Sequence, residues 1–260
     1  MRKALLTSIL LAGSALVASP AFADDTPAAA PAPTSAFTIT GAADVSSQYR
    51  FRGISQSDNK PVFQGTFTIA HSSGFYLSTW GSSATANNAV NIGGTEIDVY
   101  GGYSKTISGI TLDGGLYGYI YPGATAGNYF EVYGDVSKAF GPVTAKAGVN
   151  WAPKQHNLEA LGGTKYNVYV FGELGLAVPN FPITFHSHVG HTAGAFDFVT
   201  NGGVEDYIDY TVGASYKWKA LTFDISYVGT NISKDDTSLI DNDFHRVAKG
   251  VVVGTITASF

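Results

Sequence analysis

Apolar and polar residues alternate through most of this chain, and the alternating segments are joined by connectors that are in turn short and long. Alternation over four to eight residues predicts a strand with two unlike faces. Within residues 97–104, one face carries Ile97 and Val99, whereas the other carries Asp98 and Tyr100. The pattern therefore predicts an all-β fold of consecutive antiparallel hairpins.

We predict about 12 strands, near residues 37–49, 61–71, 74–81, 94–105, 109–121, 128–139, 142–152, 164–177, 181–192, 205–217, 220–230 and 247–260. Links after even-numbered strands are tight, such as Ser72-Ser73 and Trp218-Lys219, whereas links after odd-numbered strands are longer. Strands of about ten residues, rising about 3.3 Å each and tilted by about 40°, span an apolar band of roughly 25 Å. These features predict a transmembrane antiparallel up-and-down β-barrel of the bacterial outer membrane.

Ionised residues lie on the polar face of nearly every predicted strand. Because charges are not packed into a dry core without partners, water must reach this face. In a soluble fold the face would be the outer surface, and in a barrel it is the lumen; alternation alone does not separate the two. If it is a lumen, we expect these residues to line it: Asp44, Arg50, Asp98, Asp113, Glu131, Asp135, Lys146, Glu173, Asp209, Lys217 and Asp224.

The first residues predict a cleaved export signal. Arg2 and Lys3 precede an apolar run, and residues 21–23 form an A-x-A cleavage site, so we assign residues 1–23 to a signal peptide. Residues 24–36 are rich in Ala and Pro and predict a disordered periplasmic tether, and residues 37–260 predict one barrel. Loss of the leader leaves 13 basic against 20 acidic residues, a balance that disfavours a nucleic-acid partner.

The segment after the first strand is distinctive: residues 49–65 read YRFRGISQSDNKPVFQG. With the later segments TEIDVYGGY at 95–103 and YFEVY at 129–133, the mature chain resembles the TorF family of proteobacterial outer-membrane porins. The resemblance implies an outer-membrane location and a porin role. It implies no substrate, cofactor or catalytic residue.

We therefore expect passive diffusion of small hydrophilic solutes, with a mild preference for cations because acidic side chains outnumber basic ones on the polar face. The carboxylates could instead pair with basic neighbours or simply hydrate the lumen. A second possibility is a non-conducting adhesive or structural barrel, filled by aromatic side chains of polar-face parity: Tyr100, Tyr117, Tyr119, Tyr133, Tyr169, Phe171 and Tyr207. A lipid hydrolase is a third possibility, but no nucleophile elbow supports it, and we expect no enzyme.

Arg50 and Arg52 enter the first long loop. They could fold inward as a positive gate facing the acidic wall, or bind lipopolysaccharide phosphates at the rim. His186 and His188 share one face, but no third ligand is specified, so we expect neither a metal nor a cofactor. The expected partners are outer-membrane lipid and lipopolysaccharide, the solutes, and the barrel-assembly machinery, which would read the terminal aromatic Phe260.

Overall fold

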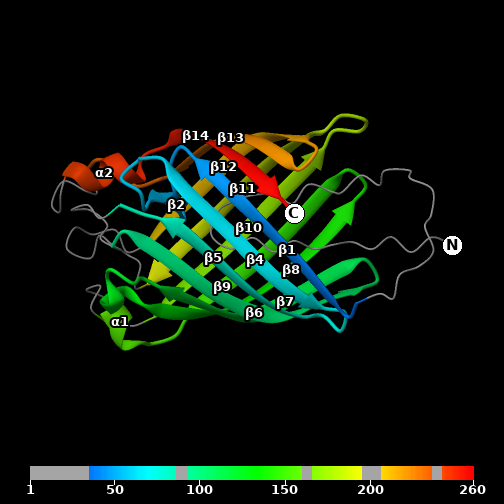
Figure 1. Ribbon diagram of the computed structural model, residues 1–260. Helices are drawn as coiled ribbons and strands as arrows, with labels where there is room; N and C mark the ends of the chain where they lie inside the picture. Colours follow the sequence, from blue (N-terminus) through cyan, green and yellow to red (C-terminus); the bar gives the residue numbers. More distant parts are fainter. Residues whose placement is uncertain (1–34, 86–92, 160–165, 195–205, 236–241) are drawn as a thin grey trace.

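The computed structural model describes residues 35–85, 93–159, 166–194, 206–235 and 242–260. The expected leader and nearly all of the expected tether lie outside these residues. Within them, twelve strands close into one antiparallel barrel in which each strand pairs with its neighbours in the chain and the last strand pairs with the first (Figure 1).

The barrel strands are long and follow each other with few other elements between them. They are β1 (Phe37–Ser46), β4 (Val62–His71), β5 (Phe75–Ser83), β6 (Thr95–Ile107), β7 (Ile110–Ile120), β8 (Tyr129–Phe140), β9 (Val143–Ala152), β10 (Asn167–Ala177), β11 (Ile183–Gly194), β12 (Asp206–Trp218), β13 (Leu221–Thr230) and β14 (Val251–Ser259). The remaining elements are β2 (Arg50–Phe51), β3 (Ile54–Ser55), the 3-10 turn Thr125–Gly127, α1 (His156–Glu159) and α2 (Asn242–Ala248).

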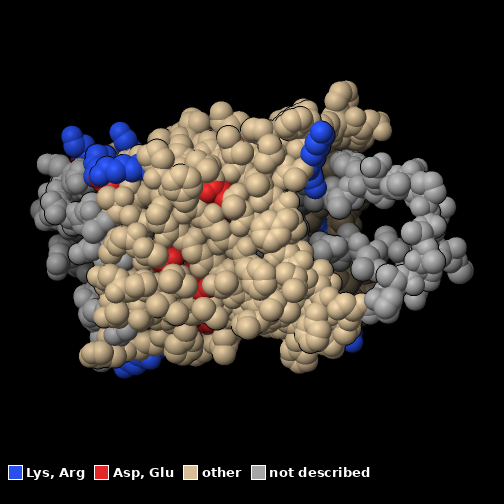
Figure 2. All heavy atoms as spheres, in the orientation of Figure 1, with Lys and Arg blue, Asp and Glu red and all other residues tan. Residues whose placement is uncertain are grey.

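The predicted fold class is confirmed: the chain forms a closed antiparallel barrel of twelve strands. Its apolar face points outward, since Leu174, Ile225 and Ile256 are 54%, 62% and 47% exposed, and its polar face points inward, where Asp98 is 2% exposed. Between the two ends of the molecule, the face seen in Figure 2 shows no Lys or Arg and only small areas of Asp and Glu. On this face, Lys and Arg side chains are therefore confined to the two ends.

The short connectors between barrel strands all lie at one end of the barrel, and the longer connectors lie at the other. The short-turn end carries residues 72–74, 108–109, 141–142, 178–182 and 219–220. Several turn residues there have positive φ, including Ser108 at 52° and Asn180 at 66°. The opposite, long-loop end carries the longer connectors together with α1 and α2 (Figure 1). Among the described residues, no helix is long and apolar enough to cross a bilayer.

Trp151 and Trp218 both lie on the outward face, 48% and 52% exposed, at opposite ends of the wall. Because β9 runs toward the long-loop end and β12 away from it, each tryptophan closes its strand at a different rim. This is the arrangement expected of two interfacial aromatic girdles.

The first predicted strand differs from the structure. It was predicted to reach residue 49, but β1 ends at Ser46, and the chain then turns into the barrel to form the two-stranded β2–β3 ribbon. At the turn the hydroxyl of Ser46 donates to the carbonyl of Gln48 (2.9 Å). The backbone of Tyr49 then bonds within the loop instead of with the wall, to Ser57 Oγ (3.0 Å) and the N–H of Gln56 (2.9 Å). We call residues 47–61 the inserted loop.

Candidate functional site in the barrel lumen

The inserted loop ends in a tight hairpin tip. Arg52 and Gly53, between β2 and β3, both have positive φ, at 46° and 80°, as a type I′ turn requires. A Cβ on Gly53 would lie 2.6 Å from the carbonyl oxygen of Gly229 in β13. The tip therefore rests directly against the barrel backbone, and glycine is needed both for its conformation and for this close approach.

The side chain of Arg52 crosses the lumen to β8. Its Nη2 donates to both carboxylate oxygens of Glu131, at 2.7 and 2.8 Å, and both side chains are almost fully buried. Its guanidinium carbon lies 4.1 Å from the centre of the Tyr169 ring. Glu131 also accepts hydrogen bonds from Asn150 (2.9 Å) and Tyr119 (3.1 Å). Strands β7 to β10 thus provide a fitted seat for one loop arginine.

Arg50 has a different role from Arg52. It donates to the backbone carbonyls of Gly53 (2.6 Å) and Lys249 (2.9 Å) and to the side chains of Gln48 (2.9 Å) and Asn59 (3.2 Å). These bonds stabilise the loop itself and tie it to the segment before β14. Of the two arginines expected to face the acidic wall, Arg52 is therefore the one that binds a wall carboxylate.

The inserted loop is also anchored at the rim. Asp58 pairs with Arg246 of α2 and with Lys60 (2.8 Å), and Asn59 donates to the carbonyl of Arg246 (3.1 Å). The side chains of Lys60 and Arg246 hold the pKa of Asp58 below its ordinary value through these hydrogen bonds. Because Asp58 is thus ionised at neutral pH, the rim anchor is charged on both sides.

Aromatic side chains fill the lumen around the hairpin. Tyr100 stacks on Tyr117 with ring centres 4.7 Å apart, and Tyr119 stacks on Tyr129 at 4.2 Å. Tyr49 of the inserted loop lies 5.2 Å from Trp80. All six rings are less than 8% exposed. Loop and wall therefore form one packed layer in the half of the lumen near the long-loop end.

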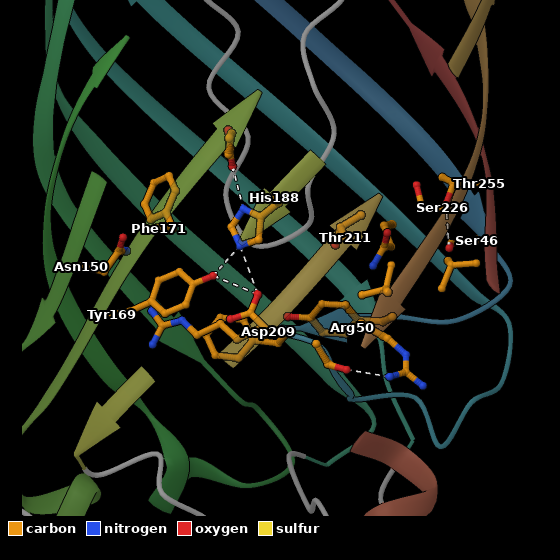
Figure 3. Close-up of a pocket in the computed structure, with 18 of the residues that line it drawn as sticks. Ser46, Arg50, Asn150, Tyr169, Phe171, His188, Asp209, Thr211, Ser226 and Thr255 are labelled. Carbon is orange, nitrogen blue, oxygen red and sulfur yellow. Dashed lines mark hydrogen bonds and ion pairs between the residues drawn. The ribbon is translucent and has the colours of Figure 1, made fainter. Parts of the chain in front are cut away.

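A cavity of about 1310 Å³, including the part open to solvent, adjoins this layer, and charged, hydroxyl-bearing and aromatic side chains line it together. Its wall includes Arg50 and Arg52 on the loop side. On β8 it includes Tyr133 and Asp135 but not Tyr129, so it extends from the hairpin toward the short-turn end. Figure 3 shows labelled side chains from the loop and from several strands converging on this space.

Histidine and carboxylate side chains form the cavity's main polar network. His188 contacts the hydroxyl of Tyr169 (2.7 Å), Asp209 (3.1 Å) and Glu173 (3.3 Å) (Figure 3). In the neighbouring strands, Lys146 of β9 lies 3.2 Å from Asp135 of β8. Most cavity carboxylates thus already have a partner from a neighbouring strand.

The predicted lumen residues separate into two groups. The cavity is lined by Arg50, Asp135, Lys146, Glu173, Asp209 and Asp224. Asp44, Asp98, Asp113 and Glu131 also face inward and are buried but lie outside this lining; Lys217 lies toward the short-turn end of β12. Asp98 and Asp113 accept hydrogen bonds from Tyr117 and Tyr76, both at 2.7 Å. The structure brings the first group together around one space.

Sequence reasoning did not assign Arg52 to Glu131 or His188 to the cavity network. The parity of His188 was visible, since it follows His186 by two residues. The partner of Arg52 was not, because Glu131 is 79 residues away and belongs to another hairpin.

Within the described residues, no group of three or more His, Asp or Glu side chains is arranged to hold a metal ion.

One chain of contacts is relevant to the possibility that the protein is a lipid hydrolase. It joins Ser226, Asp224 and His186. Ser226 donates to one oxygen of Asp224 (2.5 Å), and the other oxygen lies 2.7 Å from Nε2 of His186. A nucleophilic serine needs the imidazole next to it and the acid behind. Here the carboxylate lies in the middle, so this chain lacks the order of a catalytic triad.

Comparison with solved structures finds the same fold. The KdgM porin superposes with a TM-score of 0.56 at 12% identity, covering 85% of this chain and 99% of that chain. The NanC porin gives a TM-score of 0.54 at 12% identity, covering 86% and 99%. KdgM in complex with disordered oligogalacturonate gives 0.51 at 12% identity, covering 85% and 98%.

No curated protein matches the sequence. The comparisons do not confirm the resemblance to the TorF family, which stays a prediction. A family match does cover most of the chain, from residue 30 to residue 260. The chain belongs to Gcw_chp, a family described as bacterial proteins of unknown function.

Proposed function

We propose that this protein is a porin-type channel of the bacterial outer membrane that lets small hydrophilic solutes diffuse through its lumen. The supporting observation is a cavity with charged side chains in its lining, inside a closed barrel whose outer face is apolar. The fold shared with the KdgM and NanC porins agrees with this role. The inserted loop and the aromatic layer narrow the route at the long-loop end, and Arg52 holds the loop in place.

The proposed channel has a weak preference for cations. Four carboxylates line the cavity, Asp135, Glu173, Asp209 and Asp224, against the basic residues Arg50, Arg52 and Lys146. A low-dielectric wall focuses the field of such groups on the lumen. Because ion pairs and histidine contacts compensate several of the carboxylates, the preference is small.

Planar-bilayer recording tests both statements. The purified barrel should give discrete conductance steps, with a reversal potential in a KCl gradient that favours K⁺. Asp224→Asn should reduce this preference, because Asp224 lines the cavity. Asp206→Asn is the matched control, since Asp206 is exposed and pairs with His191 (3.2 Å). A wild-type reversal potential favouring Cl⁻ would contradict the selectivity.

The packed aromatic layer favours a second candidate, a non-conducting barrel with an adhesive or structural role. In that case neither the wild-type protein nor a variant without the Arg52 anchor conducts. If Arg52→Ala conducts and the wild type conducts less, the layer is a closed state of a channel. Bilayer recording of both proteins therefore separates the two candidates.

The proposed partners follow from location. Lys60 and Arg246 at the rim are positioned to meet lipopolysaccharide phosphates, although Asp58 offsets part of their charge. The apolar outer face would contact membrane lipid, and Phe260 would be recognised by the barrel-assembly machinery. Binding of lipopolysaccharide that is unchanged by Lys60→Ala together with Arg246→Ala would remove the rim from this proposal.

A further inference from the structure

The seat of Arg52 is built almost entirely by the barrel. Glu131 belongs to β8, Tyr169 to β10 and Asn150 to β9. The loop contributes the arginine and the neighbouring ring of Phe51, whose centre lies 4.8 Å from the guanidinium carbon. The wall itself therefore supplies the carboxylate and the aromatic ring face that Arg52 contacts.

This combination of groups suits a guanidinium. The two oxygens of Glu131 accept from one nitrogen of the planar group, and the face of Tyr169 lies 4.1 Å from its central carbon. A guanidinium is planar, stacks on aromatic faces and is more weakly hydrated than an ammonium. It therefore loses less on transfer into a buried site and gains the contact with the ring.

Asn150 and Tyr119 fix the orientation of Glu131. Both donate to its Oε2, at 2.9 and 3.1 Å, so the carboxylate is held with its oxygens toward the lumen even where no arginine supplies the bond. Glu131 itself is 0% exposed. The wall thus holds the acceptor ready, which lowers the ordering cost of binding a cation.

The seat borders the cavity. Arg52, Tyr169 and Asn150 all line it, so a solute in the cavity reaches the guanidinium and the ring that it covers. The arginine is held there in a strained backbone conformation, with φ at 46°. This strain opposes the binding of Arg52 in the seat. A solute that carries the same guanidinium group without such strain therefore competes better for the seat than it otherwise would.

We propose that this seat is a guanidinium-binding site, which Arg52 occupies as an internal ligand. Solutes that end in a monosubstituted guanidinium compete with Arg52 for Glu131 and Tyr169, release the hairpin and so favour their own passage. The release and passage rest on the proposed channel function, whereas the binding site does not.

Binding is tested on the Arg52→Ala variant, with ethylguanidinium as the probe because it reproduces the end of the arginine side chain. In detergent at constant ionic strength, ethylguanidinium should raise the thermal unfolding midpoint saturably. It should do so at about tenfold lower concentration than ethylammonium, the difference that one charge-assisted contact supplies. Adding Glu131→Gln to Arg52→Ala should abolish the shift. Equal effects of the two cations would overturn the proposal.

Arg52→Lys serves if the alanine variant does not fold, since it keeps the charge and loses the planar group. Ethylguanidinium should displace the lysine at lower concentration than it displaces the wild-type arginine. The readout is protease cleavage within residues 47–61 of protein held in liposomes. Cleavage that responds equally in wild type and Arg52→Lys would also overturn the site.

Bilayer recording then tests the release. Ethylguanidinium should increase the conductance of the wild type and partly block Arg52→Ala, in which the empty seat retains the cation. If Arg52→Ala binds the probe but no variant conducts, the channel function and the release are wrong while the binding site stands. If the channels conduct and ethylguanidinium acts like ethylammonium, the channel stands and this inference is wrong.

Discussion

Gly53 is the residue that lets the hairpin tip approach the barrel wall. Its φ of 80° lies in the left-handed region, and an added Cβ would lie 2.6 Å from both the carbonyl oxygen of Gly229 and a methyl of Thr230. Close approach and backbone conformation therefore make separate demands at the same position, and a substitution with a matched control tells them apart.

We expect Gly53→Ala to loosen the inserted loop. Strain of about 1–3 kcal/mol from the backbone adds to the clash with β13. Single-channel conductance should rise, and protease cleavage within residues 47–61 should accelerate. Gly109→Ala is the control, because Gly109 has φ 77° but open space where the Cβ would lie. If both variants behave like the wild type, the tip does not hold the loop.

Asp58 gives the rim anchor a pH dependence. Lys60 and then Arg246 lower the pKa of this carboxyl from its ordinary value of 3.8 by donating hydrogen bonds to it. A carboxylate with a lowered pKa in the folded state stabilises that state above the ordinary pKa, and the stabilisation is lost as the pH falls through the lowered one. The anchor should therefore persist at neutral pH and fail in acid.

The measurement is hydrogen exchange of residues 55–61 in wild type and Asp58→Asn at the same pH. At pH 6 the wild type should be better protected from exchange than Asp58→Asn, because only the wild type has the carboxylate that forms the charged anchor. At a pH well below 3.8 the two proteins should exchange alike. A difference that persists unchanged in acid would show that Asp58 acts through packing rather than charge.

Strands are the elements that the sequence predicted best. Each barrel strand matches a predicted one because residues two apart lie on the same face of the wall, and the contrast between an apolar outer face and a polar inner face requires strict alternation. Asp98 and Val99 illustrate this, being 2% and 44% exposed on consecutive positions. The same parity placed Asp135, Glu173 and Asp209 on the inner face before their neighbours were known.

The inserted loop could not be predicted in the same way. Its fold depends on partners remote in sequence, such as Glu131 for Arg52 and Lys249 for Arg50, and no local period encodes them. An Arg-Gly pair at a turn of two residues was the available signal, but glycine is common in the chain. The alternation along a strand also left open whether aromatic residues such as Tyr117 fill the lumen. It predicts which face of the wall a side chain lies on, but not the rotamer that the side chain adopts.

The outward face of β12 permits a test of depth. Val212 lies at the middle of the strand and is 62% exposed, whereas Ile208 lies near its long-loop end and is 41% exposed. In vesicles, Val212→Arg should lower the free energy of unfolding by about 2–4 kcal/mol and Ile208→Arg by about 0–1 kcal/mol. Denaturant-induced unfolding in lipid measures both. Equal costs would place the membrane elsewhere on the wall.

At the scale of the whole molecule, closure is the step that turns a ribbon of hairpins into a lumen. The β1–β14 seam pairs five residues of β1, from Ala42↔Ser259 to Ser46↔Thr255, whereas β1 pairs along its full length with β4. Two further backbone bonds, both 3.0 Å, join Gly41 and Phe260. The cavity and the seat of Arg52 exist only while this short seam holds.

Phe260 protects the seam as well as ending it. Its ring lies over Gly41, since a Cβ there would be 2.5 Å from the ring. An aromatic ring across from a strand glycine covers the backbone bonds that the glycine leaves bare. A cross-strand contact of this kind contributes roughly 0.2–1 kcal/mol. The proposed recognition by assembly machinery is therefore separable from this stabilisation of the closed barrel.

We expect Phe260→Ala to impair both roles. In cells, the folded barrel should be depleted from the outer membrane; in vesicles without any machinery, the variant should refold with a lower denaturant midpoint. Phe140→Ala is the control, because Phe140 is an outward aromatic residue, 56% exposed, at the same end of the barrel. A variant that refolds like the wild type in vesicles yet fails in cells would assign Phe260 to recognition alone, and the seam would then be held by its backbone bonds.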